Sequence, residues 1–285
     1  MTFGPNPWQQ TAWDWRAAGN FIGGGAGSGI IVFAALSGLL GRAAPLQFAC
    51  GSVLVAAGLV CVWLEIGRPW RALHVFFHPR RSWMSREAFL AALLLPCAIA
   101  AAFGVPGAAP AAALLALGFV YAQARILKAA RGIPAWREPA LVPLVVATGL
   151  AEGAGLFMFS SLPHGTGSVP IALLFAGLVA TRWLLWRRYR GRLVAAPQAL
   201  AALDAAARPL QWFGTWAALA LVAAALALAA LAGGAIDAGT PALAAGLAGI
   251  NAVLAGAWFK YVLITRAAFN QGFALARLPV RGVAR

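Results

Sequence analysis

Five polar residues near the ends of apolar segments are the first candidates for chemistry. Glu65 ends one such segment, Glu87 lies about one helical turn inside the next, and Arg125 lies about one turn from the end of a third. Asp14 and Asn20 open the first segment at a similar depth. A partly desolvated carboxylate beside arginines has a tunable proton affinity, which a two-electron, two-proton carrier such as a quinone needs at its ring oxygen. The alternative is that these acids only reach to the membrane surface and pair with loop arginines.

A second candidate is Glu152, which lies more than two turns from either end of its apolar segment. Ionisable groups at that depth are energetically expensive and therefore point to function. Arg182, on the following segment, is the nearest basic residue by depth. The two side chains either form a structural ion pair, which is the favoured interpretation, or one station of a proton path.

The composition shows which kind of element must position these residues. Of the 285 residues, 62% are hydrophobic and only 10% are charged, whereas soluble domains carry about 25% charged residues. This excludes a soluble enzyme, a disordered chain and a collagen-like fibre, and it indicates an integral membrane protein. The net charge of +15 is interpreted as membrane topology, and no nucleic acid partner is expected.

Hydrophobic segments predict an all-α polytopic membrane protein with eight transmembrane helices in one bundle and one membrane-anchor domain over residues 1–285. The predicted spans are residues 18–41, 44–66, 84–104, 108–129, 139–160, 168–187, 209–233 and 241–263. Each has about 20 residues, enough to cross roughly 30 Å of hydrocarbon as a helix.

The basic residues predict the orientation of these spans. With both termini on one side, all of the 22 Lys and Arg residues except Arg42 fall on that side, so both termini are expected in the cytoplasm and the chain in a bacterial inner membrane. All 12 Trp residues fall in the same half. This asymmetry favours a cytoplasmic face that docks a partner, the alternative being a lopsided aromatic belt.

Metal and haem ligands are sparse. The three cysteines are far apart, and the three histidines lie in predicted loops, so no b-type haem and no metal site is expected in this chain. These residues are Cys50, Cys61, Cys97, His74, His78 and His164. Gly19, Gly23 and Gly27 form a bare stripe on the first helix, and close helix packing is its favoured interpretation.

Three segments carry a resemblance to a known family. Residues 65–72 read Glu-Ile-Gly-Arg-Pro-Trp-Arg-Ala, and residues 82–87 read Ser-Trp-Met-Ser-Arg-Glu. Arg125 is followed by Gly-Ile-Pro-Ala-Trp at 132–136. These segments resemble the haem-free membrane anchor subunit of dimethyl sulfoxide reductase and, more distantly, the anchors of polysulfide reductases. Residues 13–20 look like anchors associated with phenylacetyl-CoA:acceptor oxidoreductase.

The resemblance implies a quinone-reactive anchor, with menaquinone or ubiquinone as its ligand. It also implies two partners, a four-cluster iron–sulfur subunit and a catalytic subunit that holds molybdopterin. The family's quinol-site carboxylate corresponds to Glu87, whereas a family histidine is replaced here by Glu65. The complete expected quinone site consists of Glu87, Glu65, Arg71, Trp83, Arg125, Asn20, Asp14 and Trp70.

The charge pattern also predicts the side of the membrane on which the partner subunits lie, and two other functions are considered beside the quinone-reactive anchor. Because the charge pattern puts the matching loop inside, the catalytic subunits are expected in the cytoplasm, acting on a substrate confined there, such as a CoA thioester or sulfite. The resemblance of residues 13–20 implies a CoA thioester of the phenylacetyl type. One alternative is a multi-pass secondary transporter or proton-conducting subunit, with Glu152 and Arg182 along the pathway. Another is a scaffold without a quinone site.

Overall fold

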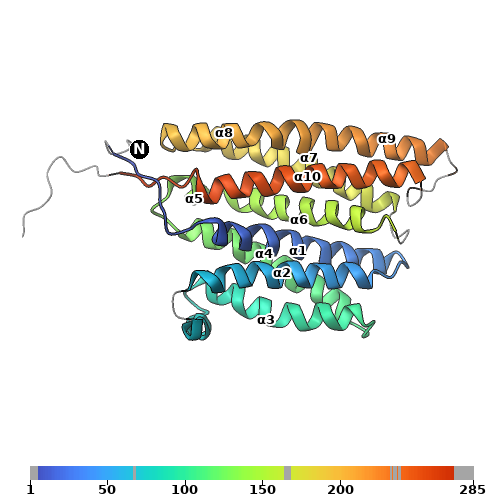
Figure 1. Cartoon of the computed structure of the whole chain (residues 1–285), viewed down its shortest axis with the longest axis horizontal. Coiled ribbons are helices and arrows are strands. Elements are labelled where there is room, and N and C mark those ends of the chain that lie inside the picture. The colour runs from blue at the N-terminus through green and yellow to red at the C-terminus, as the bar shows by residue number, and fades with distance from the viewer. Residues whose placement is uncertain are drawn as a thin grey trace, which may run out of the picture.

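In the computed structural model the chain is an α-helical bundle (Figure 1), and the structure describes residues 6–66, 69–163, 168–231, 233, 236 and 239–272. The chain is 81% helical. The helices are α1 (Trp15–Leu39), α2 (Pro45–Glu65), the 3₁₀ segment η1 (Pro69–Phe77), α3 (Trp83–Ala102), α4 (Ala108–Ala129), α5 (Pro134–Arg137), α6 (Leu141–Ser160), α7 (Val169–Arg192), α8 (Pro197–Gln211), the π-helical turn η2 (Trp212–Ala217), α9 (Ala218–Leu231) and α10 (Gly239–Thr265).

Eight of these helical stretches are long and apolar enough to span a membrane, with α8, η2 and α9 forming one continuous stretch over Pro197–Leu231. The predicted fold class and number of spans are therefore confirmed. The seventh span begins at Pro197, about 12 residues before the predicted start, because α8 is an amphipathic extension whose charged residues interrupted the hydrophobic signal. Pro197 occupies the first turn of α8, where its missing N–H removes no helical hydrogen bond.

Helix α1 lies at the centre of the bundle and packs against α2, α4, α6 and α10. Its glycine stripe faces α2: a Cβ on Gly23 would lie 2.8 Å from the carbonyl oxygen of Leu54, and one on Gly27 would lie 2.7 Å from that of Gly51. Any larger side chain would force these two helices apart. The favoured interpretation of the stripe as a packing surface agrees with this geometry.

All the longer connecting segments lie at one end of the bundle, called here the loop end (Figure 1). The end holds η1, α5, the start of α8 and the described parts of the two terminal segments, residues 6–14 and 266–272. Those terminal segments pair with each other, since the Gln10 N–H donates to the Ala268 carbonyl at 2.9 Å and the Asn270 N–H donates to that of Trp8 at 2.9 Å. Because the chain passes along the bundle an even number of times, its two ends lie at the same end of the bundle.

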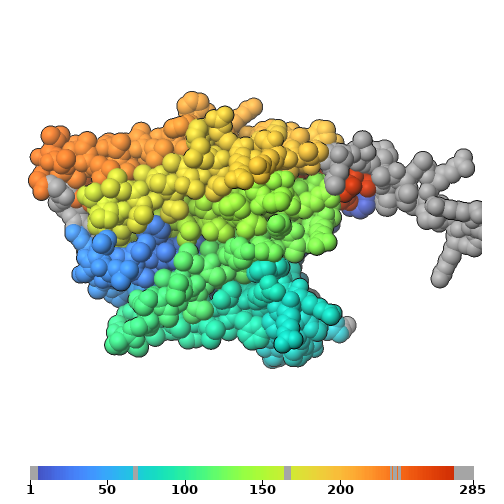
Figure 2. All heavy atoms as spheres, turned by 180° about the vertical axis from the view of Figure 1, so that it is seen from behind, coloured from blue at the N-terminus to red at the C-terminus, as the bar shows by residue number. Residues whose placement is uncertain are grey.

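The opposite face of the molecule is seen in Figure 2, where α3, α4 and the segment around η1 form the lower edge (cyan to green). At the loop end the surface is hollowed between the cyan segment and the green helices. The upper edge is formed by α7, α8 and α9 (yellow to orange). The loop end is thus the irregular end of the bundle.

Candidate functional site

The candidate site is an apolar pocket at the loop end, between α1, α2, η1 and α3. Its volume is about 550 Å³, within the range of about 300–1,000 Å³ that is typical of small-molecule sites. Its apolar lining includes Leu59 and Trp63 of α2, Leu73 and Phe76 of η1, and Met84 of α3. Such a lining suits a flat, apolar ligand.

The polar end of the pocket is formed by Glu87 and Asn20. Helix α3 begins at Trp83 because the Ser82 side chain caps it, accepting a hydrogen bond from the Ser85 N–H at 3.3 Å. This start places Glu87 about one turn inside the helix, where it is 8% exposed. Asn20 of α1 donates its side-chain amide to the Glu87 carboxylate at 3.1 Å.

A third polar side chain, Gln123 of α4, extends this arrangement. It donates to the main-chain carbonyl of Asn20 at 2.9 Å and also interacts with the Glu87 carboxylate. The remaining amide oxygens, Oδ1 of Asn20 and Oε1 of Gln123, are buried without a hydrogen-bond partner. Buried polar atoms are normally satisfied, so Oδ1 of Asn20, which lines the pocket, has unused acceptor capacity for a donor such as a ligand hydroxyl.

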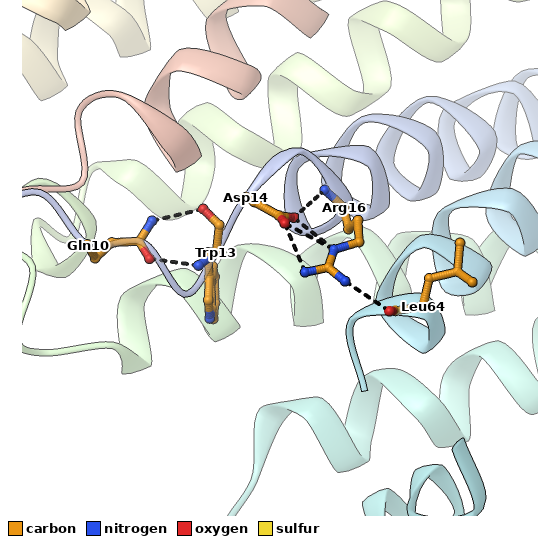
Figure 3. A network of polar contacts seen from close by, with 5 residues as sticks. All are labelled: Gln10, Trp13, Asp14, Arg16 and Leu64. Carbon is orange, nitrogen blue, oxygen red and sulfur yellow. Dashed lines mark hydrogen bonds and ion pairs between the residues drawn. The ribbon is translucent and has the colours of Figure 1, made fainter. Parts of the chain in front are cut away.

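The remaining acids of the predicted site are Asp14, next to the lining residue Trp13, and Glu65. Figure 3 shows the contacts of Asp14. Asp14 caps α1 by accepting from the Arg16 N–H at 2.8 Å, and its carboxylate forms an ion pair with the Arg16 guanidinium at 2.9 Å. The same guanidinium donates to the carbonyl of Leu64 at 2.9 Å, which ties α1 to the end of α2. The Arg16 hydrogen bonds hold the pKa of Asp14 below its usual value. Glu65, the next residue after Leu64, lines the pocket.

Trp13 directly precedes Asp14 and connects it to the pocket. Its main chain exchanges two hydrogen bonds with the Gln10 side chain, at 2.7 and 2.9 Å (Figure 3). Trp13 also lines the pocket. The ring also packs against Trp136 of α5, with centroids 4.8 Å apart. The segment before α1 is therefore fixed against the loop end rather than extended into solvent.

Five residues of the predicted site lie outside the pocket lining, and Asp14 is one of them. Trp83 is held between two guanidinium groups, with the Arg86 carbon 4.2 Å and the Arg125 carbon 4.3 Å from its ring centroid. Trp70 is 89% exposed on η1, and Arg71 beside it is also exposed. The structure thus brings Asn20, Glu65 and Glu87 together at the pocket, with Asp14 next to the lining residue Trp13. Trp70 and Arg71 are exposed at the loop end, whereas Trp83 and Arg125 are half-buried.

The second group of predicted residues lies in the interior of the bundle. Glu152 of α6 forms an ion pair at 2.5 Å with Lys260 of α10, and both side chains are almost fully buried. Arg182 of α7 is equally buried and donates to the carbonyls of Ala252 and Gly214. The ion pair of Glu152 is therefore made with Lys260 rather than with the expected Arg182. We call Glu152, Arg182 and Lys260 the buried charge cluster.

The π-helical turn η2 explains how Arg182 finds a main-chain acceptor. In a regular α-helix the Ala218 N–H would bond to the Gly214 carbonyl. Here it bonds to the carbonyls of Phe213 and Thr215 instead, and the Gly214 carbonyl accepts from Arg182. Such π-bulges are frequent at functional sites. The distortion of this helix is thus matched to a buried cation.

Two residues of these sites were not found from the sequence. Lys260 was assigned to the group of cytoplasmic basic residues because it lies near the end of its apolar segment, yet its side chain is 1% exposed. The signal that could have found it is a single lysine within the otherwise apolar run Trp258–Ile264. Gln123 gave no comparable signal, because a lone amide in an apolar helix is most often a packing contact.

Among the residues that the structure describes, no three His, Cys, Asp or Glu side chains come together in a way that could hold a metal ion. His74 makes an edge contact with Phe77 on η1, whereas His164 and the motif residues Gly67 and Arg68 lie outside the described residues. Searches of protein-family models and of curated proteins found no match to this chain.

Proposed function

We propose that this chain is the quinone-reactive, haem-free membrane anchor subunit of an iron–sulfur molybdoenzyme complex in a bacterial inner membrane. The observation that carries the proposal is the apolar pocket at the loop end, whose one buried carboxylate, Glu87, is held by the Asn20 amide. The proposed ligand is menaquinone or ubiquinone. The resemblance of the segments around Glu65 and Glu87 to dimethyl sulfoxide reductase anchors supports the same function.

A quinone fits the chemistry of the pocket residues. Its ring needs an apolar slot, which Trp63, Leu73 and Phe76 can supply, and its ring oxygen needs a proton partner, which Glu87 can supply. When a quinol is oxidised, two electrons leave for the partner subunit and two protons leave the ring oxygens. In this proposal the Glu87 carboxylate accepts one of those protons, and Asn20 keeps the carboxylate oriented toward the ring.

The partner subunits are proposed to dock on the loop end. Exposed arginines are gathered there, and Trp70 projects from η1 beside them; arginine and tryptophan are enriched at protein interfaces. Among the residues that the structure describes, the exposed arginines are Arg71, Arg80, Arg81, Arg131, Arg187, Arg188, Arg192, Arg208 and Arg266. The iron–sulfur clusters and the molybdopterin belong to these partners, proposed to lie in the cytoplasm and to act on a substrate of the phenylacetyl-CoA type.

The test uses the complex with its partner subunits in native membranes. Glu87→Gln keeps the shape of the side chain but removes its proton affinity, so quinone-linked turnover should fall by about 10²–10⁴-fold. Electron exchange between the partner subunits and a soluble dye should persist. Glu138→Gln, an acid next to α5 that does not line the pocket, is the matched control. Unchanged quinone turnover in Glu87→Gln would remove Glu87 from the mechanism.

A second candidate function is a secondary transporter or proton-conducting subunit, which the buried charge cluster favours. Ionisable residues at this depth mark many substrate and proton pathways. Purification in mild detergent separates the two proposals. An anchor should co-purify with molybdenum, iron, quinone and a partner with four-cluster cysteine motifs, whereas a transporter should purify as a lone chain and catalyse uptake in vesicles.

A further inference from the structure

The buried charge cluster is linked to the pocket through a single turn of α1. Lys260 donates from its ammonium group to the carbonyl of Phe21 at 2.7 Å, and the Ile22 carbonyl lies 3.5 Å away. Phe21 directly follows Asn20, whose side chain holds Glu87. One helical turn therefore carries both the acceptor for Lys260 and the donor for Glu87.

Gln123 of α4 lies close to both Lys260 and Asn20. The position that a Cβ on Gly25 would occupy lies 2.9 Å from the Lys260 ammonium and 3.8 Å from the amide oxygen of Gln123. The other end of the same amide donates to the Asn20 carbonyl at 2.9 Å. Because Gly25 has no side chain, the ammonium and the amide face the same small space between α1, α4 and α10.

The charges in this region do not balance. Arg182 and Lys260 are two cations against one carboxylate, Glu152, and all three are buried. The excess is therefore one positive charge when all three are ionised. In a membrane interior with a low dielectric constant this charge acts over a longer range than it would in water. The groups facing Glu87 itself are the amides of Asn20 and Gln123, with Glu65 on the wall of the same pocket.

We infer that Lys260 is a positioning residue for Glu87, acting through the α1 turn at Asn20–Ile22 and adding the positive charge that favours the Glu87 carboxylate. Glu152 holds the ammonium in place from the side of α6. Arg182 is held by main-chain carbonyls, so it supplies a second, fixed cation. The role in turnover rests on the proposed quinone function, but the effect on the titration of Glu87 does not.

The experiment follows that titration in the full-length chain, in nanodiscs and without added quinone, by infrared spectroscopy of the protonated carboxyl band. The band that Glu87→Gln removes is assigned to Glu87. Lys260→Met removes one positive charge, so the midpoint of that band should move to higher pH by about half a unit. Glu152→Gln removes one negative charge and should move it to lower pH.

Two further variants separate charge from damage to the fold. Glu152→Gln combined with Lys260→Met leaves the same excess of one positive charge on Arg182, so its midpoint should return close to that of the natural chain. Lys260→Arg keeps the charge and should keep the midpoint. Should Lys260→Met fail to fold, the remaining variants still give different expectations: a midpoint at lower pH for Glu152→Gln and a natural midpoint for the double variant. Equal midpoints in all folded variants would overturn the inference.

The same variants in the intact complex add a readout that depends on quinone. The rate of quinone turnover, plotted against pH, should contain a limb that depends on Glu87 and is absent in Glu87→Gln. In the other variants the midpoint of this limb should shift in the same direction as the infrared midpoint. A shifted infrared midpoint without any quinone turnover in the natural complex would contradict the proposed function alone. Normal quinone turnover with an unshifted midpoint would contradict the role of Lys260 alone.

Discussion

Asn20 and Glu87 lie 67 residues apart in the chain, and a 3.1 Å hydrogen bond between their side chains joins α1 to α3 at the inner end of the pocket. The hydrogen-bonding partners of the carboxylate are side-chain amides, Asn20 and Gln123, and these amides fix its orientation. The Asn20 amide in turn depends on α1, which packs against α2, α4, α6 and α10. The geometry of the candidate site is therefore set by the core packing rather than by the loops around it.

The first prediction concerns this hydrogen bond. Asn20→Ala removes the donor and leaves a buried carboxylate with one fewer partner, which costs about 1–3 kcal/mol when Glu87 is ionised. Quinone-linked turnover should fall by about tenfold, with dye-linked turnover unchanged. Ser28→Ala, a buried side chain farther along the same helix, is the control and should behave like the natural chain. Loss of activity in both variants would indicate damage to α1 instead.

The second prediction concerns the contact of α1 with α6. A Cβ on Gly153 would overlap the main chain of Gly29, whereas one on Gly177 of α7 would meet no atom within 4 Å. Gly153→Ala should therefore lower the free energy of unfolding by about 1–3 kcal/mol. Gly177→Ala should be neutral or stabilising by up to about 1 kcal/mol. Thermal unfolding in detergent, followed by tryptophan fluorescence, measures both, and equal midpoints would contradict the packing.

The third prediction concerns pH and the cap of α1. Because Arg16 lowers the pKa of Asp14 in the folded state, the stabilisation from this carboxylate is present above the unfolded value of 3.8 and is lost as the pH falls through the folded value. Asp14→Ala should cost about 1 kcal/mol at pH 7, as for other helix caps. The difference from the natural chain should shrink below pH 4 in thermal unfolding. A difference that is the same at pH 7 and pH 3 would mean that the ionised cap contributes nothing.

How much of this fold was accessible from the sequence depends on the kind of signal. The spans followed from hydropathy, and their even number followed from the distribution of basic residues. The early start of the seventh span was missed because Asp204 and Arg208 interrupt the apolar run there. Those two residues lie on an amphipathic helix, where Asp204 pairs with Arg190 of α7 at 2.6 Å.

The candidate site was predictable to the extent that depth in the membrane determines position. The expected depth in the membrane and the polar residue type predicted that Asn20, Glu65 and Glu87 lie together. All three line one pocket in the structure. Depth does not say which face of a helix a residue occupies. Trp83 begins the same helix as Glu87, yet it faces α4 and stacks with Arg125 outside the pocket. The pairing of Glu152 with Lys260 was missed for the same reason, since it depends on which helices are neighbours.

The fourth prediction concerns the side of the membrane on which the loop end lies. After replacement of the three natural cysteines by alanine, single cysteines at Arg80 and Val105 report the two ends of the bundle, because both positions are exposed. A reagent that cannot cross the membrane should label Val105→Cys in right-side-out vesicles and leave Arg80→Cys unlabelled until the vesicles are opened. The reverse pattern would place the arginines outside and overturn the proposed cytoplasmic docking.

The fifth prediction concerns the volume of the pocket. Ala88 follows Glu87 on α3 and lines the pocket, whereas Ala92, one turn farther along, is exposed on the outer surface of the same helix. Ala88→Phe should fill part of the space of about 550 Å³ and raise the KM for a quinol analogue by about tenfold or more, the loss expected when a ligand can no longer enter fully. Ala92→Phe adds the same side chain toward the lipid and should leave KM unchanged. Because both variants carry the same change on the same helix, equal KM values would show that quinol does not bind in this pocket, whatever else the chain does.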